Sequence, residues 1–146
     1  MLFRSAVLYQ ANLTGATLTG ATLLYATLTG VGSPGVRSFG ITGTPKYLPP
    51  GYKLINEYLI GPGVNLTGAY LRSTNMTGVH LAGANLTRAD FLQANLTSAN
   101  LTNANLTSAD LTQANLSGGT LTGATLTGTI WRSTTCPNGV TKSTQC

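Results

Sequence analysis

The sequence has few of the side chains that carry enzyme chemistry. Only 8% of its 146 residues are charged, and it contains three acidic residues and a single histidine, His80. So small a set cannot supply a catalytic triad, a zinc site or a pair of glycosidase carboxylates. We therefore expect a protein that is not an enzyme and that uses no metal and no cofactor.

Long apolar runs are also missing. No stretch approaches the length of a membrane span. The first ten residues, MLFRSAVLYQ, lack the apolar core and the small-residue cleavage site of a signal peptide. The sequence therefore predicts no membrane span and shows no secretion signal.

Cysteine is scarce, and its placement is informative. Cys136 and Cys146 lie ten residues apart in a polar tail that contains the turn-forming residues Pro137, Asn138 and Gly139. This context predicts a small disulfide loop, which would require an oxidising compartment. We expect a secreted or cell-surface protein; a cytoplasmic protein with two free thiols is the alternative.

Acidic residues are outnumbered by eight lysines and arginines, which gives a net charge of +5 and a pI near 9.6. Such a balance raises the question of nucleic acid as a partner. Within residues 64–130, however, two arginines and two aspartates cancel, and the other basic residues are scattered outside. Without a basic stripe or a stacking platform, nucleic acid is not an expected partner.

A five-residue repeat dominates what is present. From Leu66 to Trp131 a large apolar residue, here called a centre, recurs at every fifth position, and a small residue, usually alanine, precedes it by two. An earlier block, from Phe3 to Leu28, follows the same rule. The centres of the longer block are Leu66, Leu71, Met76, Leu81, Leu86, Phe91, Leu96, Leu101, Leu106, Leu111, Leu116, Leu121, Leu126 and Trp131.

This period predicts an all-β solenoid. Five residues fit neither an α-helix nor a long strand, yet the small residue and the centre alternate inward as in a strand. If each pentapeptide forms one side, four sides close a coil of twenty residues, and the sequence holds about five coils. The remaining positions, rich in Thr, Asn, Ser and Gly, face water or turn the corners.

The repeated motif A(N/D)LT(G/S), as at residues 94–98, resembles the bacterial pentapeptide-repeat family. The resemblance implies a right-handed quadrilateral β-helix, and the length of 146 residues predicts a single domain. The segment GITGTPKYLPPGYKLINEYLIGPG resembles an insertion, and the tail GTIWRSTTCPNG an ending, seen in some members. The repeat and its interruption divide the domain into a first repeat block (1–30), an inserted flap (31–63), a main block (64–131) and a tail (132–146).

The flap holds the richest group of aromatic residues, namely Phe39, Tyr47, Tyr52 and Tyr58. They are the candidate surface for a ligand or partner, although covering the solenoid wall is the usual role of such rings. Residues 52–60 are apolar enough to form a strand. Elsewhere, twenty-residue stacking places Asp90 beside Asp110, but no third ligand accompanies them.

Several outward asparagines lie in N-x-[ST] sequons, so glycosylation is formally open, although the repeat itself generates the pattern. They are Asn12, Asn65, Asn75, Asn85, Asn95, Asn100, Asn105 and Asn115. Rows of Thr-x-Thr are typical of surfaces that bind ice, so a surface protein that interacts with ice or carbohydrate is an alternative function. A DNA mimic that acts on gyrase, as known for relatives, is a second alternative, but three acids supply little negative field.

The expected function is a non-enzymatic structural or protein-interaction scaffold. The resemblance implies that Trp131 plugs the last coil, whereas no cap is visible at the first. An open coil edge can pair with another chain. We therefore expect a homo-oligomer or filament built by end-to-end stacking, with a further protein or glycan partner that the sequence does not identify.

Overall fold

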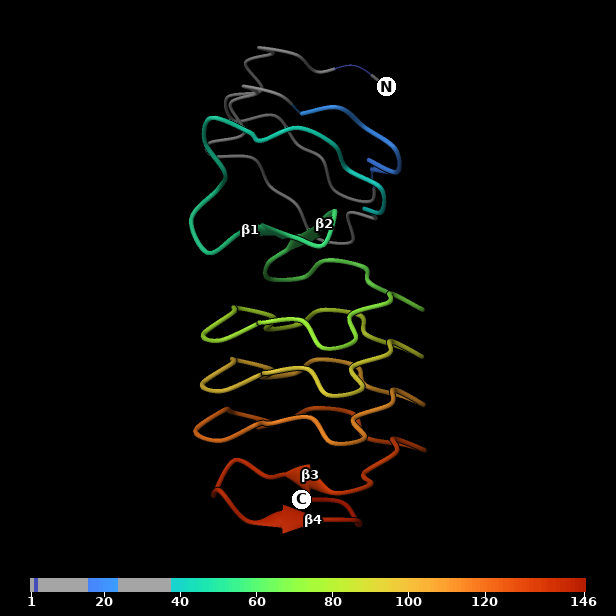
Figure 1. Cartoon of the computed structure of the whole chain (residues 1–146), viewed down its shortest axis with the longest axis vertical. Helices are drawn as coiled ribbons and strands as arrows, with labels where there is room; N and C mark the ends of the chain where they lie inside the picture. Colours follow the sequence, from blue (N-terminus) through green and yellow to red (C-terminus); the bar gives the residue numbers. More distant parts are fainter. Residues whose placement is uncertain (1, 3–15, 24–37) are drawn as a thin grey trace.

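The computed structural model describes residues 2, 16–23 and 38–146, and it shows a stack of coils (Figure 1). Every parallel bridge between coils joins residues twenty apart, from Leu2 and Thr22 at one end to Asn115 and Thr135 at the other. The twenty-residue coil predicted from the sequence is therefore confirmed. The expected centres Phe3 and Leu28 lie outside the described residues.

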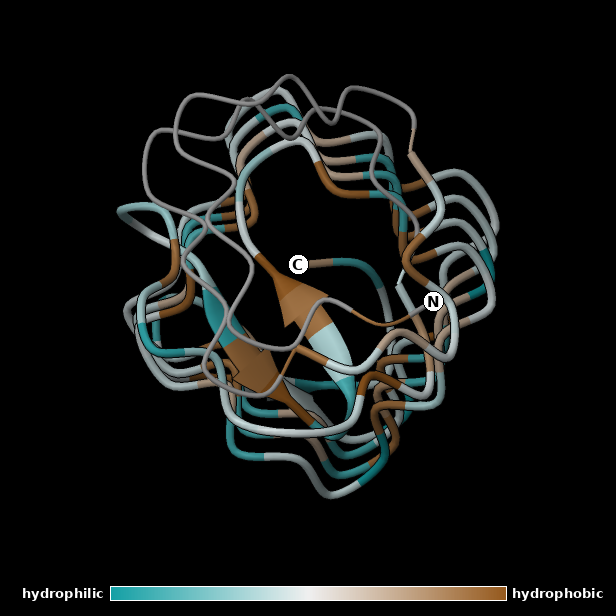
Figure 2. Ribbon diagram, turned by 90° about the horizontal axis from the view of Figure 1, so that it is seen from above, coloured by the Kyte–Doolittle hydropathy of each residue, from teal (hydrophilic) through white to brown (hydrophobic). Residues whose placement is uncertain are grey.

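The chain forms an all-β, right-handed quadrilateral solenoid, as predicted. Viewed along its axis, the coils superimpose into a four-sided outline (Figure 2). Each wall is formed by equivalent sides of successive coils, which pair in parallel. The chain passes from one such side to the next through the other three sides of the coil, and connections of this kind between parallel strands are almost always right-handed. The main-block rungs are single bridges, because each side is too short to extend into a strand.

The interior is filled by the two inward positions of each pentapeptide. Ala84, Leu86, Ala104 and Leu106 are fully buried, and Phe91 is the largest side chain with no exposure. Each buried leucine contributes about 1.5–3 kcal/mol relative to exposure. Alanine recurs because two side chains from every side must share one narrow tube.

Backbone hydrogen bonds join each side to the one below it. The amide of Leu86 donates to the Asn105 carbonyl at 2.8 Å, and the amide of Asn105 donates back to Ala84 at 2.9 Å. A third bond comes from the corner residue, where Arg88 donates to Thr107 at 2.9 Å. Corners are left-handed, and even Arg88 has a φ of 58°.

Asparagine and aspartate recur at the outward position before each centre because their side chains accept hydrogen bonds from the residue two positions on. Oδ1 of Asn95 accepts from the amide of Thr97 at 3.1 Å and from its hydroxyl at 2.6 Å. Asp110 accepts from the Thr112 amide in the same way. Such Asx turns satisfy an amide that the ladder leaves unpaired.

The flap forms an antiparallel hairpin of β1 (Lys53–Ile55) and β2 (Tyr58–Ile60). The single strand expected over 52–60 is wrong, because Asn56 and Glu57 both take positive φ and reverse the chain. Two consecutive left-handed residues are the geometry of a tight hairpin turn.

Strand β2 lies between two separate cores. Leu59 packs with Leu18, Leu23 and Ile41, whereas Tyr58 and Ile60 belong to the core of the main block. Because side chains alternate along a strand, one short strand serves both cores. The hairpin therefore divides the apolar interior instead of lying outside it.

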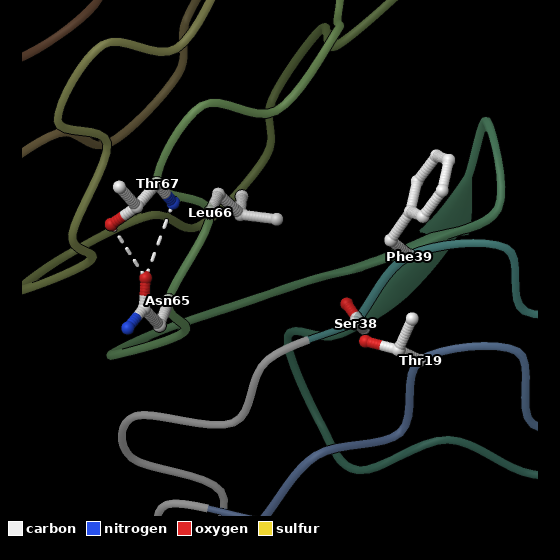
Figure 3. Close-up of a pocket in the computed structure, with 6 residues that line it drawn as sticks. All are labelled: Thr19, Ser38, Phe39, Asn65, Leu66 and Thr67. Atoms are coloured by element: carbon white, nitrogen blue, oxygen red, sulfur yellow. Dashed lines mark hydrogen bonds between the residues drawn. The ribbon is translucent and has the colours of Figure 1, made fainter.

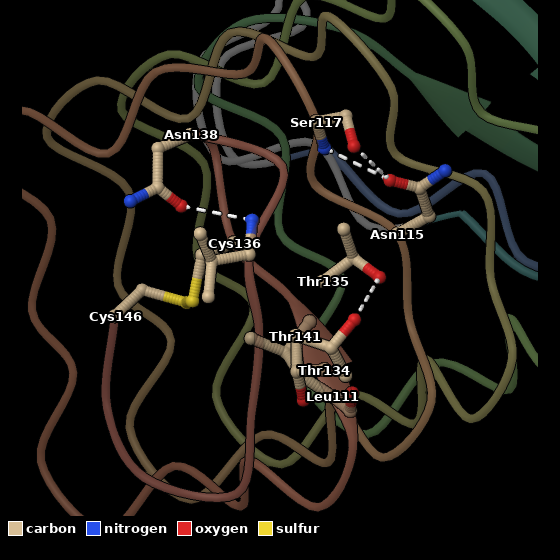
Figure 4. Close-up of a disulfide and its surroundings, with 10 residues drawn as sticks. Leu111, Asn115, Ser117, Thr134, Thr135, Cys136, Asn138, Thr141 and Cys146 are labelled. Atoms are coloured by element: carbon tan, nitrogen blue, oxygen red, sulfur yellow. Dashed lines mark hydrogen bonds between the residues drawn. A yellow bond between two sulfur atoms is a disulfide. The ribbon is translucent and has the colours of Figure 1, made fainter.

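A second hairpin ends the chain. It consists of β3 (Thr134–Thr135) and β4 (Thr141–Lys142), which pair antiparallel beyond the last full coil (Figure 1). A disulfide joins Cys136 to Cys146, with an S–S distance of 2.06 Å (Figure 4). The cysteine pairing expected from the sequence is present in the structure.

Candidate interaction surfaces

Most of the solenoid surface is a neutral polar wall. The sequon asparagines of the main block point outward, and each Oδ1 is held by the residue two positions on, as for Asn85 with Thr87 and Asn100 with Thr102. Asn75 and Asn95 are exposed. Asn12 lies outside the described residues. Glycosylation of these residues stays a prediction.

The four aromatic residues of the flap do not share one environment. Phe39 and Tyr47 are each 53% exposed, whereas Tyr58 is only 5% exposed and Tyr52 is half-buried. The rings of Phe39 and Tyr58 approach to 5.5 Å between centroids. Tyr47 instead lies beneath the ammonium group of Lys46. Of the four rings, those of Phe39 and Tyr47 are therefore exposed, that of Tyr52 is partly buried and that of Tyr58 is buried. Their role as an interaction surface stays a prediction.

Phe39 borders a notch in the wall, with a volume of about 250 Å³ (Figure 3). The notch is lined by Thr19, Ser38, Phe39, Asn65, Leu66 and Thr67. No backbone hydrogen bond joins residues 38–40 to residues 65–67. Instead, the Ser38 hydroxyl accepts from the amide of Leu59 at 2.8 Å. The notch therefore marks the level at which the hairpin interrupts the ladder.

One wall carries charge. Asp90 bridges to Asp110 one coil below, as the repeat predicts, and Nε of Arg72 donates to Oδ2 of Asp90. The hydrogen bond and charge of Asp90 raise the pKa of the Arg72 guanidinium, and the charge of Asp110 adds to this shift. Sequence reasoning missed this ion pair, although the eighteen-residue separation of Arg72 and Asp90 places them one coil apart.

In the part of the chain that the structure describes, metal-ligating side chains do not cluster. Among the described residues, no group of three or more His, Cys, Asp or Glu side chains could hold an ion. His80 is exposed and lies beside Gly51 of the flap. Nor does any helix in the described ranges have the length and apolar character to cross a membrane.

The C-terminal end is closed on only two sides. Trp131 is buried, and the amides of Leu116 and Gly118 donate to Thr135 and Pro137 at 2.8 Å. The amides of Leu121 and Leu126, in contrast, have no backbone acceptor in the part of the chain that the structure describes. The cap expected from Trp131 is therefore incomplete, which the repeat pattern could not show.

The open half of this end exposes part of the core. Leu121 and Leu126 are half-buried, although residues at equivalent positions one coil earlier are fully buried. A recess of about 250 Å³ opens beside them. Its lining residues are Leu121, Leu126, Cys136, Pro137, Asn138 and Cys146.

Comparison with known proteins gives a consistent result. The sequence matches the family of pentapeptide repeats, in eight copies, over residues 2–31, 65–103 and 93–128. No curated protein matches it.

The solved structures that are similar to this chain include three that are described here. HetL, a pentapeptide repeat protein involved in heterocyst differentiation regulation from the cyanobacterium Nostoc sp. strain PCC 7120, is 29% identical; the match covers 97% of this chain and 68% of that one, with a TM-score of 0.40. Rfr23 from the cyanobacterium Cyanothece 51142 is 24% identical, with 84% and 85% covered and a TM-score of 0.40. QnrB1, a plasmid-mediated fluoroquinolone resistance protein, is 15% identical, with 92% and 70% covered and a TM-score of 0.30.

Proposed function

Because this chain belongs to the pentapeptide-repeat family, we propose that it is a scaffold that binds other proteins along its walls and further copies of itself at its coil ends. Members of the family are generally non-enzymatic structural or interaction proteins. The core uses only the inward side chains, and most of the outward side chains lie on the surface, where they can contact partners. This arrangement supports recognition, and nothing in the described residues points to catalysis.

The open C-terminal edge carries the self-association part of the proposal. Inside the stack, the side centred on Leu106 donates two amides downward, from Leu106 to Thr125 and from Ser108 to Thr127. The side centred on Leu126 holds the same position one coil later but makes neither bond to any described residue. Unpaired strand edges beside exposed apolar surface are templates for another chain.

The experiment is a measurement of mass by light scattering over a range of protein concentrations. We expect masses at multiples of the chain, and filaments or stacked particles in electron micrographs. Replacing both Leu121 and Leu126 by lysine places charge in the open half of the end and should leave monomers. The matched control is Thr107→Lys, an outward position in the middle of the stack. A strictly monomeric wild-type protein at high concentration would contradict the proposal.

Export is the second part of the proposal. The disulfide between Cys136 and Cys146 supports it, because such bonds persist in oxidising compartments and are rare in the cytosol. Alkylation of protein taken directly from its native source, followed by mass spectrometry, tests this part. Two alkylated thiols would favour the cytoplasmic alternative.

The alternative functions have less support. A DNA mimic needs a field of negative charge, and of the two carboxylates on the charged wall Asp90 is neutralised by Arg72. A gyrase supercoiling assay tests it, and no effect is expected. An ice-binding surface predicts thermal hysteresis, whereas the walls bind their own threonine hydroxyls in Asx turns, as at Thr67 and Thr107.

A further inference from the structure

One wall departs from the default residues of the repeat. It is built from the sides centred on Leu71, Phe91, Leu111 and Trp131 and is called here the Phe91 wall. In the main block, the other three walls present almost only Asn, Thr and Ser beside their centres. The Phe91 wall instead presents Tyr70, Arg72, Leu92, Ile130 and Arg132, together with the charged alternative of the motif at Asp90 and Asp110 and the usual threonine only at Thr112. The fold does not demand these residues, because the other walls have the same backbone bonds without them.

The ion pair on this wall shows how a guanidinium group docks there. Arg72 reaches down one coil to Asp90, which lies eighteen residues later. Leu92 occupies the equivalent position eighteen residues before Asp110. The surroundings of Asp110 therefore correspond to those of Asp90, except that the apolar Leu92 replaces the arginine.

One carboxylate oxygen of Asp110 remains for a partner. Its Oδ1 accepts from the Thr112 amide at 2.9 Å, and no basic side chain in the described ranges pairs with Asp110. Leu92 is half-buried, and the repeat gives it the place relative to Asp110 that Arg72 has relative to Asp90. It therefore offers aliphatic surface against which the stem of an arginine could pack. The position thus combines unpaired negative charge with a nearby apolar contact.

Apolar side chains extend this position along the wall. Ile130 is 40% exposed one coil below Asp110, and Tyr70 is 71% exposed two coils above it. At a strand spacing of about 4.8 Å, Tyr70 and Asp110 are about 10 Å apart along the axis. An exposed ion pair alone adds little to affinity, so binding would depend on these flanking contacts as well.

We propose that the Phe91 wall binds a protein segment that places an arginine on Asp110, against Leu92, and an apolar side chain on Ile130 or Tyr70. The charge of Asp110 complements the arginine, and the existing contact of Arg72 with Asp90 supplies the geometry. The proposal specifies the partner chemistry of one wall and rests on the protein-binding part of the proposed function, not on the coil ends.

A displayed library of random peptides, selected on the folded protein, tests this inference. Enriched peptides should carry arginine together with an aromatic or aliphatic residue. Their affinity should fall about threefold to fivefold for Asp110→Asn, as expected for the loss of one exposed ion pair. This variant keeps the Asx turn, as Asn95 does. The affinity should fall similarly for Leu92→Arg, which supplies the missing guanidinium from within the chain. Thr102→Arg, at the equivalent position on the opposite wall, should leave affinity unchanged.

The outcomes separate the two proposals. Selection that yields no peptide dependent on Asp110, or peptides that lack a basic residue, would overturn the inference. Should Leu92→Arg fail to fold, Asp110→Asn still decides, because it adds and removes no volume of note. Self-association should be the same in all three variants, since none of them alters the coil ends. If the wild-type protein does not self-associate, only the end-stacking part of the proposed function is contradicted.

Discussion

The ring of Tyr52 lies against the α-carbon of Gly61, and its hydroxyl donates to the carbonyl of Pro62 at 2.8 Å. A β-carbon at Gly61 would stand 2.2 Å from Cδ1 of that ring, which is well inside contact distance. Residues on both sides of the hairpin are thus locked together where the chain returns to the main block. The contact explains why a glycine is needed at this point of the GPG sequence.

We therefore expect Gly61→Ala to lower the free energy of unfolding by about 1–3 kcal/mol, the usual cost of overpacking. Urea denaturation measures this loss. Tyr52→Ala is the control, and the double variant should lose less than the sum of the two single losses, because the clash disappears with the ring. Additive losses would show that Tyr52 and Gly61 do not interact.

The stacking of the coils was predictable in detail because it depends on single residues that recur. Leu86 and Leu106 lie twenty residues apart in the sequence and in adjacent coils of the structure, and the same spacing stacks Asp90 on Asp110. Inward positions need only be small or apolar, and a period of five shows which positions these are. The tube could therefore be predicted without any knowledge of its contacts.

The flap and the C-terminal end could not be predicted in this way, because no repeat governs them. Asn56-Glu57 lacks the glycine that usually marks a two-residue hairpin turn. The sequence therefore predicted one continuous strand where the chain in fact reverses direction. The placement of Leu59 in one core and Tyr58 in another depends on packing between distant segments. The half-open edge at Leu126 depends on where the tail folds.

Removing one Asx turn should weaken the stack slightly. We expect Asn95→Ala to cost about 1 kcal/mol, because the Thr97 amide loses its acceptor. Asn95→Asp should be nearly neutral, since Asp90 and Asp110 hold the amides of Leu92 and Thr112 in the same way. Thermal unfolding of the two variants measures the difference. Equal losses would mean that the side-chain acceptor does not matter.

Leucine truncation should cost less at the open end than in the middle of the stack. Leu106 is fully buried, whereas Leu126, at the equivalent position one coil later, is half-buried. We expect Leu106→Ala to cost about 2–5 kcal/mol, because it leaves a closed cavity. Leu126→Ala should cost clearly less under conditions in which the protein is monomeric. Equal costs in urea titrations would show that another part of the chain covers the end.

The disulfide should stabilise the tail without stabilising the stack. It closes a loop of ten residues, worth about 3 kcal/mol in the chain-entropy account. Within that loop the Cys136 amide donates to Val140, and the Gly139 amide donates to Cys136, both at 2.8 Å. In Cys146→Ser, hydrogen exchange at these two amides should quicken about a hundredfold, since each tenfold change corresponds to about 1.4 kcal/mol. The amide of Leu86, which lies in the middle of the stack, is the internal control and should keep its protection. A parallel loss of protection at Leu86 would show that tail and stack open as one unit and that the disulfide clamps the whole solenoid.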